Sequence, residues 1–407
     1  MKVLVFTSLF PNNIWPNHGV FIKNRMSKVS TQEGVTIKVV APVPYFPPIK
    51  GTHRWQYSQI CQKEIIEGLE IHHPRYLMIP KVAMFLHGVM MAFGVILGVS
   101  KIRRDFDFDI IDAHYVYPDG LAAILLGCIF KKPVVVSARG SDINLFRKFP
   151  IVKKLVRYTL RQAKHVIAVS QALGDVMVEM GIASDKITVI PNGVDLEKFP
   201  FRPKKESRLR LGLPEKKMIL SVGNLTPNKG FDVLIGAMKI LLEKFQILDT
   251  YLVIVGEGSM RPSLEKMIEA YGLKDYVRLI GSVPQDCLWP WYGAADLFCL
   301  ASEREGWPNV VLEALACGTP VVATAVGGIS EIVRSENIGV LVSRTCQDFA
   351  RAILEALNRP WDSLALRSYA SEHTWDNVAY SVSHVFESLM KSDLEFPVDA
   401  LALPKRR

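Results

Sequence analysis

Short apolar runs alternate with helix-length amphipathic segments along nearly the whole chain. The first half contains six such runs: KVLVFTS, VTIKVVAP, DIIDAHY, KPVVVSA, HVIAVS and ITVIPN. The second half contains five more: MILSVGN, TYLVIVGEG, VRLIGSV, ADLFCLAS and TPVVATAVGG. Strands of parallel sheets are apolar almost throughout, because helices cover both faces of such sheets. The pattern therefore predicts an α/β fold with two doubly wound parallel sheets.

The length of 407 residues also indicates two domains, because single hydrophobic cores stop growing near about 250–300 residues. Prolines and charges interrupt the pattern in FPFRPKKESR, which begins at Phe199. We expect an N-terminal domain of residues 1–200 and a second domain of residues 201–375. Residues 376–392 are expected to form a helix that packs back on the first domain, and residues 393–407 to form a loose tail.

One apolar segment, Val82 to Val99, is long enough to be a candidate membrane-spanning helix. It contains one His and no charged residue, and Gly94 and Gly98 form a GxxxG spacing. The alternative is a buried helix, which we favour because the strand-like run DIIDAHY follows closely. The apolar N-terminal run ends at Pro11 without a small-residue cleavage site, so we interpret it as a strand and not as a signal peptide.

The composition is that of an ordinary globular protein. Apolar residues make up 49% of the chain and charged residues 22%, which argues against disordered, collagenous and disulfide-rich classes. The six cysteines lie far apart, with no CxxC pair and no metal-ligand spacing to a His. We expect them to be reduced and mostly buried thiols of a cytosolic protein.

The formal charge of +9 is concentrated in the first half of the chain. Residues 1–200 contain 25 basic and 15 acidic residues, whereas residues 201–407 contain 24 and 25. Between Asn144 and Lys164 there are seven basic residues and no acidic one, and four of them share one helical stripe: Lys153, Arg157, Arg161 and Lys164. Such a helix suits an anionic membrane surface, with a solvated basic face as the alternative. Nucleic acid is not expected as a partner, because neither a binding motif nor interleaved aromatic residues accompany the charge.

The most informative motif is EREGWPNVVLEALACGTPVVAT. A turn that contains Gly306 and Asn309 leads into a helix expected over Val310 to Ala316. The N-terminus of that helix presents unpaired backbone N–H groups and the positive end of the helix dipole, which suit a diphosphate. Glu305 and Glu313 are expected on nearly the same face, where two carboxylates can accept hydrogen bonds from sugar hydroxyls. The alternative is a capped helix with surface glutamates.

Two loops after strands of the second half contain further candidates. In SVGNLTPNKG, Gly223 ends a strand, and Lys229 could aim its ammonium at a phosphate in the crevice beyond the strand ends. This is not a Walker motif, because GxxxxGK[ST] is absent, and a solvated loop lysine is the alternative. The loop VGEGS contains Gly256, which is a weak signal.

Four residues near strand ends of the first half are also candidates. Gly19, in HGVF, would let the backbone approach a ligand closely. His114 ends the run DIIDAH and could donate or relay a proton, with a satisfied buried histidine as the alternative. Arg139 follows VVVSA and could bind an anion, or it could pair with Asp142.

Together these motifs resemble the retaining GT-B glycosyltransferases of family four, and the resemblance covers almost the whole chain. Its most specific parts are EGWPNVVLEALACGTPVVAT, PNGVD, GNLTPNKG and the early SLFPN and HGVF. HYVYPDG and SARGSDIN look especially like the subgroup that makes teichuronic-type and other exopolysaccharides. The resemblance implies two Rossmann-like domains that face each other across a cleft, the first for the acceptor and the second for a nucleotide-sugar donor.

The resemblance also implies a reaction. A hexose-type sugar would move from a nucleotide-diphosphate donor to a glycan or lipid-linked glycan with retention of its anomeric configuration, in the biosynthesis of bacterial-type surface polysaccharide or glycolipid. No cofactor and no metal are expected, and no DxD-type metal motif stands out. We expect a cytoplasmic protein attached peripherally to the inner face of the cell membrane. The alternatives are a nucleotide-sugar epimerase on the same scaffold and a non-catalytic nucleotide-sugar-binding protein.

Roles of single residues follow from the same resemblance. Lys229 would hold the donor diphosphate, Glu313 the ribose hydroxyls and Glu305 the transferred sugar. Three residues would be catalytic: His114, Lys229 and Glu305. Ten would contact the donor: Gly19, Gly223, Asn224, Lys229, Gly256, Glu305, Gly306, Asn309, Val310 and Glu313. Four would contact the acceptor or an anion: Arg139, Asp142, Lys153 and Arg157.

Two positions depart from the pattern of many relatives. Asn224 stands where an arginine is common, so one phosphate-binding cation is either missing or supplied by Arg139. Arg139 itself stands where a histidine is common. Because both glutamates and Lys229 are present, we expect an active enzyme.

Overall fold

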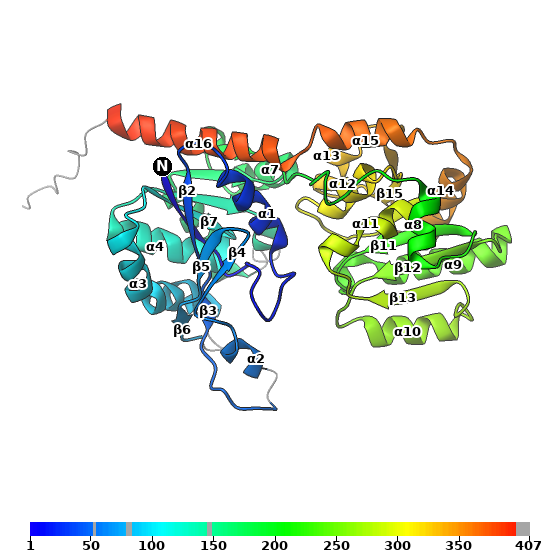
Figure 1. Cartoon of the computed structure of the whole chain (residues 1–407), viewed down its shortest axis with the longest axis horizontal. Coiled ribbons are helices and arrows are strands. Elements are labelled where there is room, and N and C mark those ends of the chain that lie inside the picture. The colour runs from blue at the N-terminus through cyan, green and yellow to red at the C-terminus, as the bar shows by residue number, and fades with distance from the viewer. Residues whose placement is uncertain (52–53, 79–83, 145–148, 396–407) are drawn as a thin grey trace, which may run out of the picture.

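The computed structural model describes residues 1–51, 54–78, 84–144 and 149–395, without the side chains of residues 392–395. The chain forms two α/β domains, which lie side by side in Figure 1. Each domain is a mainly parallel sheet with helices on both faces, as the alternating apolar pattern predicts. The predicted fold class is therefore confirmed.

An eight-stranded sheet organises the N-terminal domain. Its strand order is β10 (Ile187–Val189), β9 (His165–Ala168), β8 (Val134–Ala138), β7 (Ile110–His114), β1 (Lys2–Phe6), β2 (Thr36–Val40), β5 (Leu69–His72) and β4 (Lys63–Ile66). Neighbouring strands are parallel except β4 and β5. We did not expect these two strands, because their short sequences, KEII and LEIH, contain charged residues and lack an apolar run. A separate pair joins β3 (Val43–Pro44) to β6 (Arg75–Tyr76).

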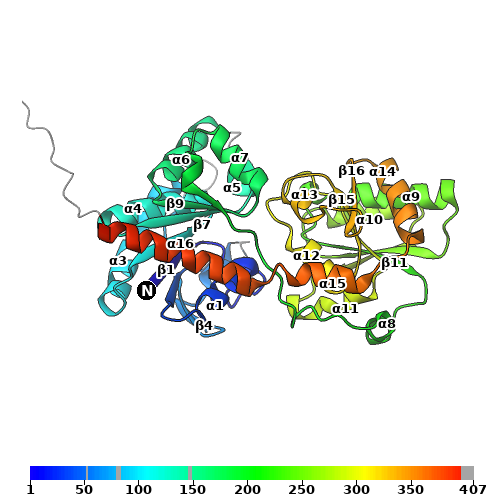
Figure 2. The same cartoon turned by 90° about the horizontal axis from the view of Figure 1, so that it is seen from above.

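Helices cover both faces of this sheet, as Figure 2 shows. On one face α1 (Val20–Val29) and α16 (Trp375–Glu395) enclose a core with the strands. Four helices cover the other face: α3 (His87–Asp105), α4 (Leu121–Phe130), α6 (Pro150–Gln162) and α7 (Gln171–Glu179). Five shorter helical segments are η1 (Met84–Leu86), α2 (Trp55–Ser58), η2 (Val116–Gly120), α5 (Ser141–Asn144) and η4 (Ser184–Lys186).

A six-stranded parallel sheet organises the C-terminal domain. Its strand order is β13 (Val277–Gly281), β12 (Thr250–Val255), β11 (Lys217–Val222), β14 (Leu297–Leu300), β15 (Val321–Thr324) and β16 (Gly339–Val342). One face is covered by α9 (Phe231–Phe245), α10 (Arg261–Ala270) and α14 (Cys346–Asn358). The other is covered by α11 (Trp289–Ala294), α12 (Asn309–Ala316), α13 (Gly328–Ile332) and α15 (Ser363–Ser371), and α8 (Lys204–Leu211) packs on α11.

The chain crosses between the domains twice. The first crossing lies between β10 and α8, where we expected the domain boundary, and the second precedes α16. Val194 and Thr374 form a short parallel bridge where the two crossings meet. Helix α16 then packs against α1 of the N-terminal domain. It continues to Glu395, so residues 393–395 of the expected loose tail are helical, while residues 396–407 lie outside the described part of the chain.

The apolar segment that begins at Val82 belongs mainly to α3, although residues 82 and 83 lie outside the described part. With η1 it forms a helix from Met84 to Asp105 that is long and apolar enough to cross a membrane, the one such helix in the described residues. Val95 and Val99 are buried in the domain core, and Gly94 lies against Tyr76. The GxxxG glycines are thus used for packing within this domain.

The opposite face of α3 is open to solvent. Phe93 and Leu97 are 68% and 75% exposed. The helix is therefore not the buried element that we favoured, but a covering helix with one exposed apolar face. The expectation of mostly buried cysteines is also wrong for Cys61, Cys128 and Cys287, which are exposed.

Candidate active site

The carboxyl ends of both sheets face the cleft between the domains. The strand order turns between β11 and β14 in one sheet and between β1 and β7 in the other, and ligands of open α/β sheets bind beyond such points. A cavity of about 220 Å³ lies in the cleft, with Ser170 and Leu173 on one side and Glu305 and Gly327 on the other. A larger cavity of about 580 Å³ lies at the domain crossing, and none of the predicted site residues lines it. The strand ends therefore place the candidate site in the cleft.

Lys229 and Glu305 form an ion pair at this cleft. Lys229 ends a short helical turn, η5 (Pro227–Lys229), in the loop after β11. Its Nζ lies 2.5 Å from Oε1 of Glu305, and Ser302 Oγ donates to the same oxygen at 2.6 Å. The two charged side chains are 23% and 11% exposed. Lys229 is thus not a solvated lysine, and a phosphate that approaches it would compete with Glu305 for the ammonium.

Helix α12 begins directly after this ion pair, at Asn309. Pro308 precedes it, and no side chain caps its N-terminus. The first backbone N–H groups, including that of Val310, therefore remain available to an anion. A cation and an open helix N-terminus flank one loop, which is the arrangement that suits a diphosphate.

Glu313 lies in α12 and turns its carboxylate into the domain. Tyr292 Oη donates to Oε2 at 2.7 Å, and Gln285 Nε2 donates to Oε1 at 3.2 Å. Burial raises the pKa of Glu313, and these two hydrogen bonds oppose the increase. Glu305 precedes the helix and faces Lys229, so the expectation that both glutamates share one helical face is wrong.

The backbones of the two domains touch at Gly140 and Gly306. A Cβ on Gly306 would lie 2.2 Å from the carbonyl oxygen of Arg139. A Cβ on Gly140 would lie 2.8 Å from Cα of Gly306. Both distances are shorter than a Cβ atom tolerates, so the domains approach this closely only because both residues are glycine.

His114 is completely buried at the end of β7, and both ring nitrogens face groups of its own domain. Arg139 Nη2 donates to Nδ1, so the proton of the neutral ring is on Nε2, which lies 3.0 Å from Oδ2 of Asp112. Burial lowers the pKa of His114 to about 4, and the charge of Arg139 adds to this effect. The geometry fits the buried histidine of our alternative better than a proton relay.

Arg139 and Asp142 are internal residues of the same domain. Arg139 is 9% exposed, and its Nη1 donates to Asn192 Oδ1 at 3.0 Å. Asp142 is fully buried and accepts from the backbone N–H groups of Val116, Arg139 and Gly140 at 2.8, 3.0 and 2.8 Å. These contacts make Asp142 a residue that holds the loop after β8, and its role toward an acceptor or anion stays a prediction.

Lys153 and Arg157 lie on the exposed face of α6, and neither lines the cleft cavity. Arg161 and Lys164 continue this exposed stripe. A role toward an acceptor inside the cleft therefore finds no support, whereas a role at a surface stays a prediction. Two further basic residues of the segment, at positions 147 and 148, lie outside the described residues.

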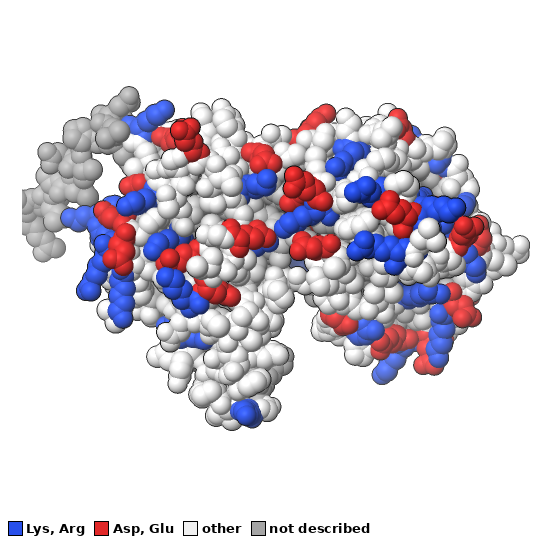
Figure 3. Space-filling model, viewed as in Figure 1, with Lys and Arg blue, Asp and Glu red and all other residues white. Residues whose placement is uncertain are grey.

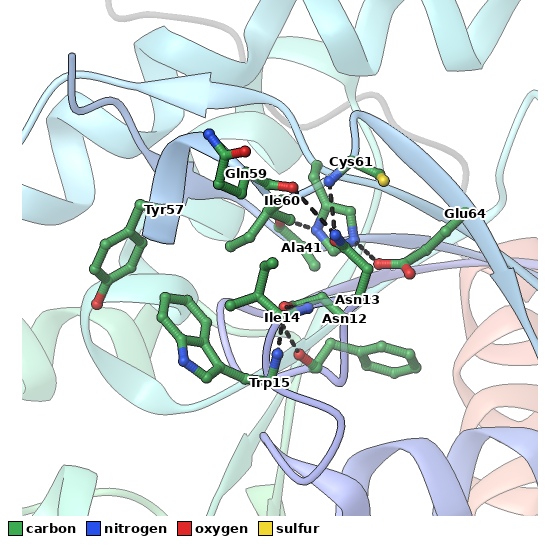
Figure 4. A network of polar contacts seen from close by, with 12 residues as sticks. Asn12, Asn13, Ile14, Trp15, Ala41, Tyr57, Gln59, Ile60, Cys61 and Glu64 are labelled. Carbon is green, nitrogen blue, oxygen red and sulfur yellow. Dashed lines mark hydrogen bonds and ion pairs between the residues drawn. The ribbon is translucent and has the colours of Figure 1, made fainter. Parts of the chain in front are cut away.

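Gly19 closes the loop after β1 and begins α1. Figure 4 shows how this loop is tied to the segment around Gln59: Asn13 Nδ2 donates to the Gln59 carbonyl at 3.1 Å, and its Oδ1 accepts from Cys61 N at 3.0 Å. Gly19 has a φ of +68°, and a Cβ there would lie 2.2 Å from the carbonyl oxygen of Leu9. The loop itself thus requires glycine, whatever ligand lies nearby.

Gly223 and Gly256 shape the loop that presents Lys229. A Cβ on Gly256 would lie 1.9 Å from the Gly223 carbonyl oxygen, so the loops after β11 and β12 meet backbone to backbone. Cδ and Cε of Lys229 would lie 3.8 Å from a Cβ on Gly223. Asn224 is exposed beside them.

Arg304 is a cleft cation that the sequence motifs did not single out. It lines the cavity, and its Nε donates to Asn228 Oδ1 at 3.4 Å. Since Arg139 is internal, Arg304 is the better candidate for the cation that Asn224 does not supply. Within the described part of the chain, no group of three or more His, Cys, Asp or Glu side chains is placed to hold a metal ion.

Five other residues that position the site were missed: Arg25, Asp112, Asn192, Gln285 and Tyr292. The sequence DIIDAH could have indicated Asp112. Residues two apart on a strand lie on the same face, so Asp112 shares a face with the candidate His114. The motif PNGVD contains Asn192. The other three come from helices or turns without any motif, so only the fold brings them to the site.

Comparison with known proteins agrees with this geometry. Residues 31–198 match the family Glycosyltransferase Family 4, and residues 203–373 match Glycosyl transferases group 1. TuaC of Bacillus subtilis, named as a teichuronic acid biosynthesis glycosyltransferase, is 30% identical over 87% of this chain and 88% of its own.

Solved structures share the two-domain fold. Anabaena Alr3699/HepE in complex with UDP-glucose has a TM-score of 0.72 and 19% identity, over 95% of this chain and 100% of its own. Sucrose-phosphate synthase from Thermosynechococcus elongatus has a TM-score of 0.75 and 18% identity, over 96% and 99%. The chain therefore belongs to the group 1, family 4 glycosyltransferases, and it is a transferase enzyme with the GT-B fold.

Proposed function

We propose that this enzyme transfers a hexose-type sugar from a nucleotide-diphosphate donor to a glycan or lipid-linked glycan, with retention of the anomeric configuration. The observation that carries the proposal is the Lys229–Glu305 ion pair beside the uncapped N-terminus of α12. In the donor complex the diphosphate takes the Lys229 ammonium and the N–H groups around Val310. Glu305, released from Lys229, then accepts hydrogen bonds from the transferred sugar.

The leaving group is the second part of the proposal. Negative charge develops on the diphosphate as its bond to the sugar breaks, and fixed donors aimed at that charge lower the barrier. Lys229 and the helix N–H groups supply such donors, and Arg304 adds a second cation. The proposal therefore assigns no metal or cofactor to this step. Glu313 accepts hydrogen bonds from the ribose hydroxyls beside Tyr292.

Neither glutamate is proposed as a nucleophile. Glu313 is buried and hydrogen-bonded to Tyr292 and Gln285, and Glu305 is assigned to the hydroxyls of the transferred sugar. In the proposed step the acceptor oxygen bonds to the anomeric carbon and the bond to the phosphate oxygen breaks. The acceptor hydroxyl proton passes to that departing phosphate oxygen. His114, neutral and enclosed, takes no part in this proton transfer.

The relatives guide the choice of substrates. The Anabaena HepE structures hold UDP and UDP-glucose, and TuaC is named for teichuronic acid biosynthesis. We therefore propose a UDP-hexose as the first donor to test, and a surface polysaccharide or its lipid-linked precursor as the acceptor.

We also propose that the enzyme works at the inner face of the cell membrane, where lipid-linked acceptors lie. On α6 the basic stripe is accompanied by Ile151 and Tyr158, which are 59% and 47% exposed. On α3, which covers the same face of the sheet, Phe93 and Leu97 are exposed. Apolar side chains that insert and cations that attract anionic lipids are the two components of peripheral attachment.

A second apolar area supports this placement. Figure 3 shows that the lowest part of the N-terminal domain, around α2, β3 and β6, carries almost no charged residues on the face in view. Tyr45, Ile49 and Leu77 belong to this part and are 51%, 59% and 66% exposed. The N-terminal domain thus offers a second apolar surface.

Product analysis tests the reaction. The purified full-length protein would be incubated with UDP-glucose and other nucleotide-sugars, with and without acceptor glycans. The proposal expects nucleotide release that depends on acceptor, and a product whose anomeric configuration, measured by NMR, matches that of the donor. An altered nucleotide-sugar formed without acceptor would indicate an epimerase, and binding without turnover would indicate a binding protein. Either result would overturn the proposal.

A further inference from the structure

Two asparagines connect the domain crossing to the donor helix. Asn192 lies in the first crossing, directly after β10, and its Nδ2 donates to Oδ1 of Asn309 at 3.1 Å. Asn309 is the first residue of α12. Asn192 is 5% exposed, whereas Asn309 is partly exposed. The contact thus reaches from the interior of the molecule to the helix N-terminus that we assign to the diphosphate.

Two buried arginines fix the orientation of the Asn192 amide. Arg25 Nη2 and Arg139 Nη1 donate to its Oδ1 at 3.2 and 3.0 Å. A guanidinium can only donate, so the atom between the two arginines must be the amide oxygen. Arg25 also donates to the carbonyl oxygen of Ile190 at 2.9 Å, which holds it against the crossing. The amide nitrogen of Asn192 must therefore face Asn309.

The orientation of the Asn309 amide in the donor helix follows from that of Asn192. Because Asn192 offers an N–H group, Asn309 must turn its oxygen toward it. The Nδ2 of Asn309 is then on the other side of the amide, where no described residue accepts from it. This nitrogen is an additional donor beside the free backbone N–H groups of the first turn.

We propose that Asn192 is a positioning residue for the donor. Arg25 and Arg139 fix the orientation of its amide, and the hydrogen bond of this amide fixes the orientation of Asn309. The N–H₂ group of Asn309 then points to the donor diphosphate. The inference rests on the proposed nucleotide-diphosphate donor and adds a residue of the domain crossing to its site. Hydrogen bonds in a buried chain polarise one another, so the charge of the two arginines strengthens the final donor.

Asn192→Asp separates this role from a merely structural one. The new carboxylate has nearly the same size and accepts from both arginines, so the fold keeps its contacts. It offers only acceptors to Asn309, whose amide must turn around and present its oxygen to the diphosphate. We expect the full-length variant to bind UDP about tenfold more weakly or worse, with a thermal midpoint equal to or above that of the wild type.

Glu331→Gln is the matched control at the domain interface. Glu331 of α13 accepts from the backbone N–H groups of Gln171 and Ala172, both at 2.8 Å, at the start of α7. It joins the same two domains through other elements. If Asn192→Asp acted only by loosening the interface, Glu331→Gln would weaken UDP binding to the same extent, and that result would overturn the inference.

A double variant provides the second check. In an Asn309→Ala background the donor amide is gone, so Asn192→Asp should weaken UDP binding no further. Isothermal titration with UDP, GDP and ADP distinguishes a failure of the proposed donor from a failure of this inference alone. A wild-type protein that binds none of the three would overturn the proposed donor and this inference with it. A wild type that binds one of them no more tightly than Asn192→Asp does would overturn the inference alone.

Discussion

At the scale of single residues, the cleft is built from charged and polar groups whose partners lie far away in the sequence. Lys229 and Glu305 are 76 residues apart, and Arg139 and Asn192 are 53 apart. The sequence predicted Lys229, Glu305 and Arg139 as candidates, because each follows a strand whose carboxyl end faces a cleft. It could not predict which groups pair, since pairing depends on how the strands are ordered and how the domains meet.

Asp119 gives a prediction at this scale. It is fully buried and accepts from the N–H of Ser8 at 2.6 Å and from its hydroxyl at 2.9 Å. Burial raises the pKa of Asp119 to about 7, although the Ser8 hydrogen bonds oppose the increase. In the unfolded chain the pKa is about 3.9, so the folded state binds this proton more tightly, and stability is lost as the pH rises from about 4 through about 7.

Thermal unfolding of the wild type and Asp119→Asn between pH 5 and pH 8 measures this contribution. The midpoint of the wild type should fall by a few degrees more than that of the variant over this range. Comparing slopes removes the titration of all other groups. Parallel pH profiles would show that Asp119 does not titrate in this window.

At the scale of elements, apolar runs predicted eleven strands and the presence of helices between them. Among the strands that were not predicted, β4 and β5 have the short sequences KEII and LEIH, which contain charged residues and lack an apolar run. Helix α3 was interpreted as buried because a strand-like run follows it closely, yet that neighbour does not tell which side of the helix faces the sheet. We propose that its exposed apolar face and the basic stripe of α6 together form the surface that attaches to a membrane.

Sedimentation with anionic vesicles tests that hypothesis. Lys153→Gln with Arg157→Gln should weaken binding at low salt by about 30-fold, since each cation near the surface contributes about 1 kcal/mol. Phe93→Asn with Leu97→Asn should instead reduce the part of the binding that resists salt.

Charge-matched control variants separate this surface from the charge of the whole protein. Lys244→Gln with Lys266→Gln removes two exposed cations of the C-terminal domain and should leave vesicle binding unchanged. The membrane proposal would be abandoned if the wild type failed to sediment with the vesicles at low salt.

At the scale of the whole molecule, the sequence predicted two domains and a boundary near residue 200. It did not predict how closely they meet, because that depends on single atoms at the interface. Gly140 and Gly306 allow the backbones of the two domains to touch. Asn192 and Glu331 add hydrogen bonds between the domains. With the proposed donor site in the cleft, we expect donor binding to depend on how closely the two domains approach.

Gly140→Ala tests this connection. The added Cβ would lie 2.8 Å from Cα of Gly306 and hold the domains apart. We expect donor turnover to fall by roughly 100-fold, because displacements of about 1 Å at a reacting site have this effect. Small-angle scattering should show a larger radius of gyration with bound UDP.

Gly34→Ala is its control. Gly34 also has a positive φ, +72°, but a Cβ there would meet nothing within 4 Å. This variant places an alanine at a positive φ that is less strained than the +120° of Gly140, and it adds no contact between domains, so its turnover should stay near that of the wild type. Equal losses of turnover in both variants would show that backbone strain, and not contact between the domains, causes the effect.

The most direct measurement of the central claim is donor turnover by Lys229→Ala. Lys229 is partly exposed at the cleft, so its removal should leave the fold intact while the diphosphate loses one of its two proposed cations. We predict that nucleotide release falls at least about 100-fold, whereas Lys274→Ala, which removes an exposed cation of the same domain, stays within about twofold. Undiminished release by Lys229→Ala would contradict the assignment of the donor site.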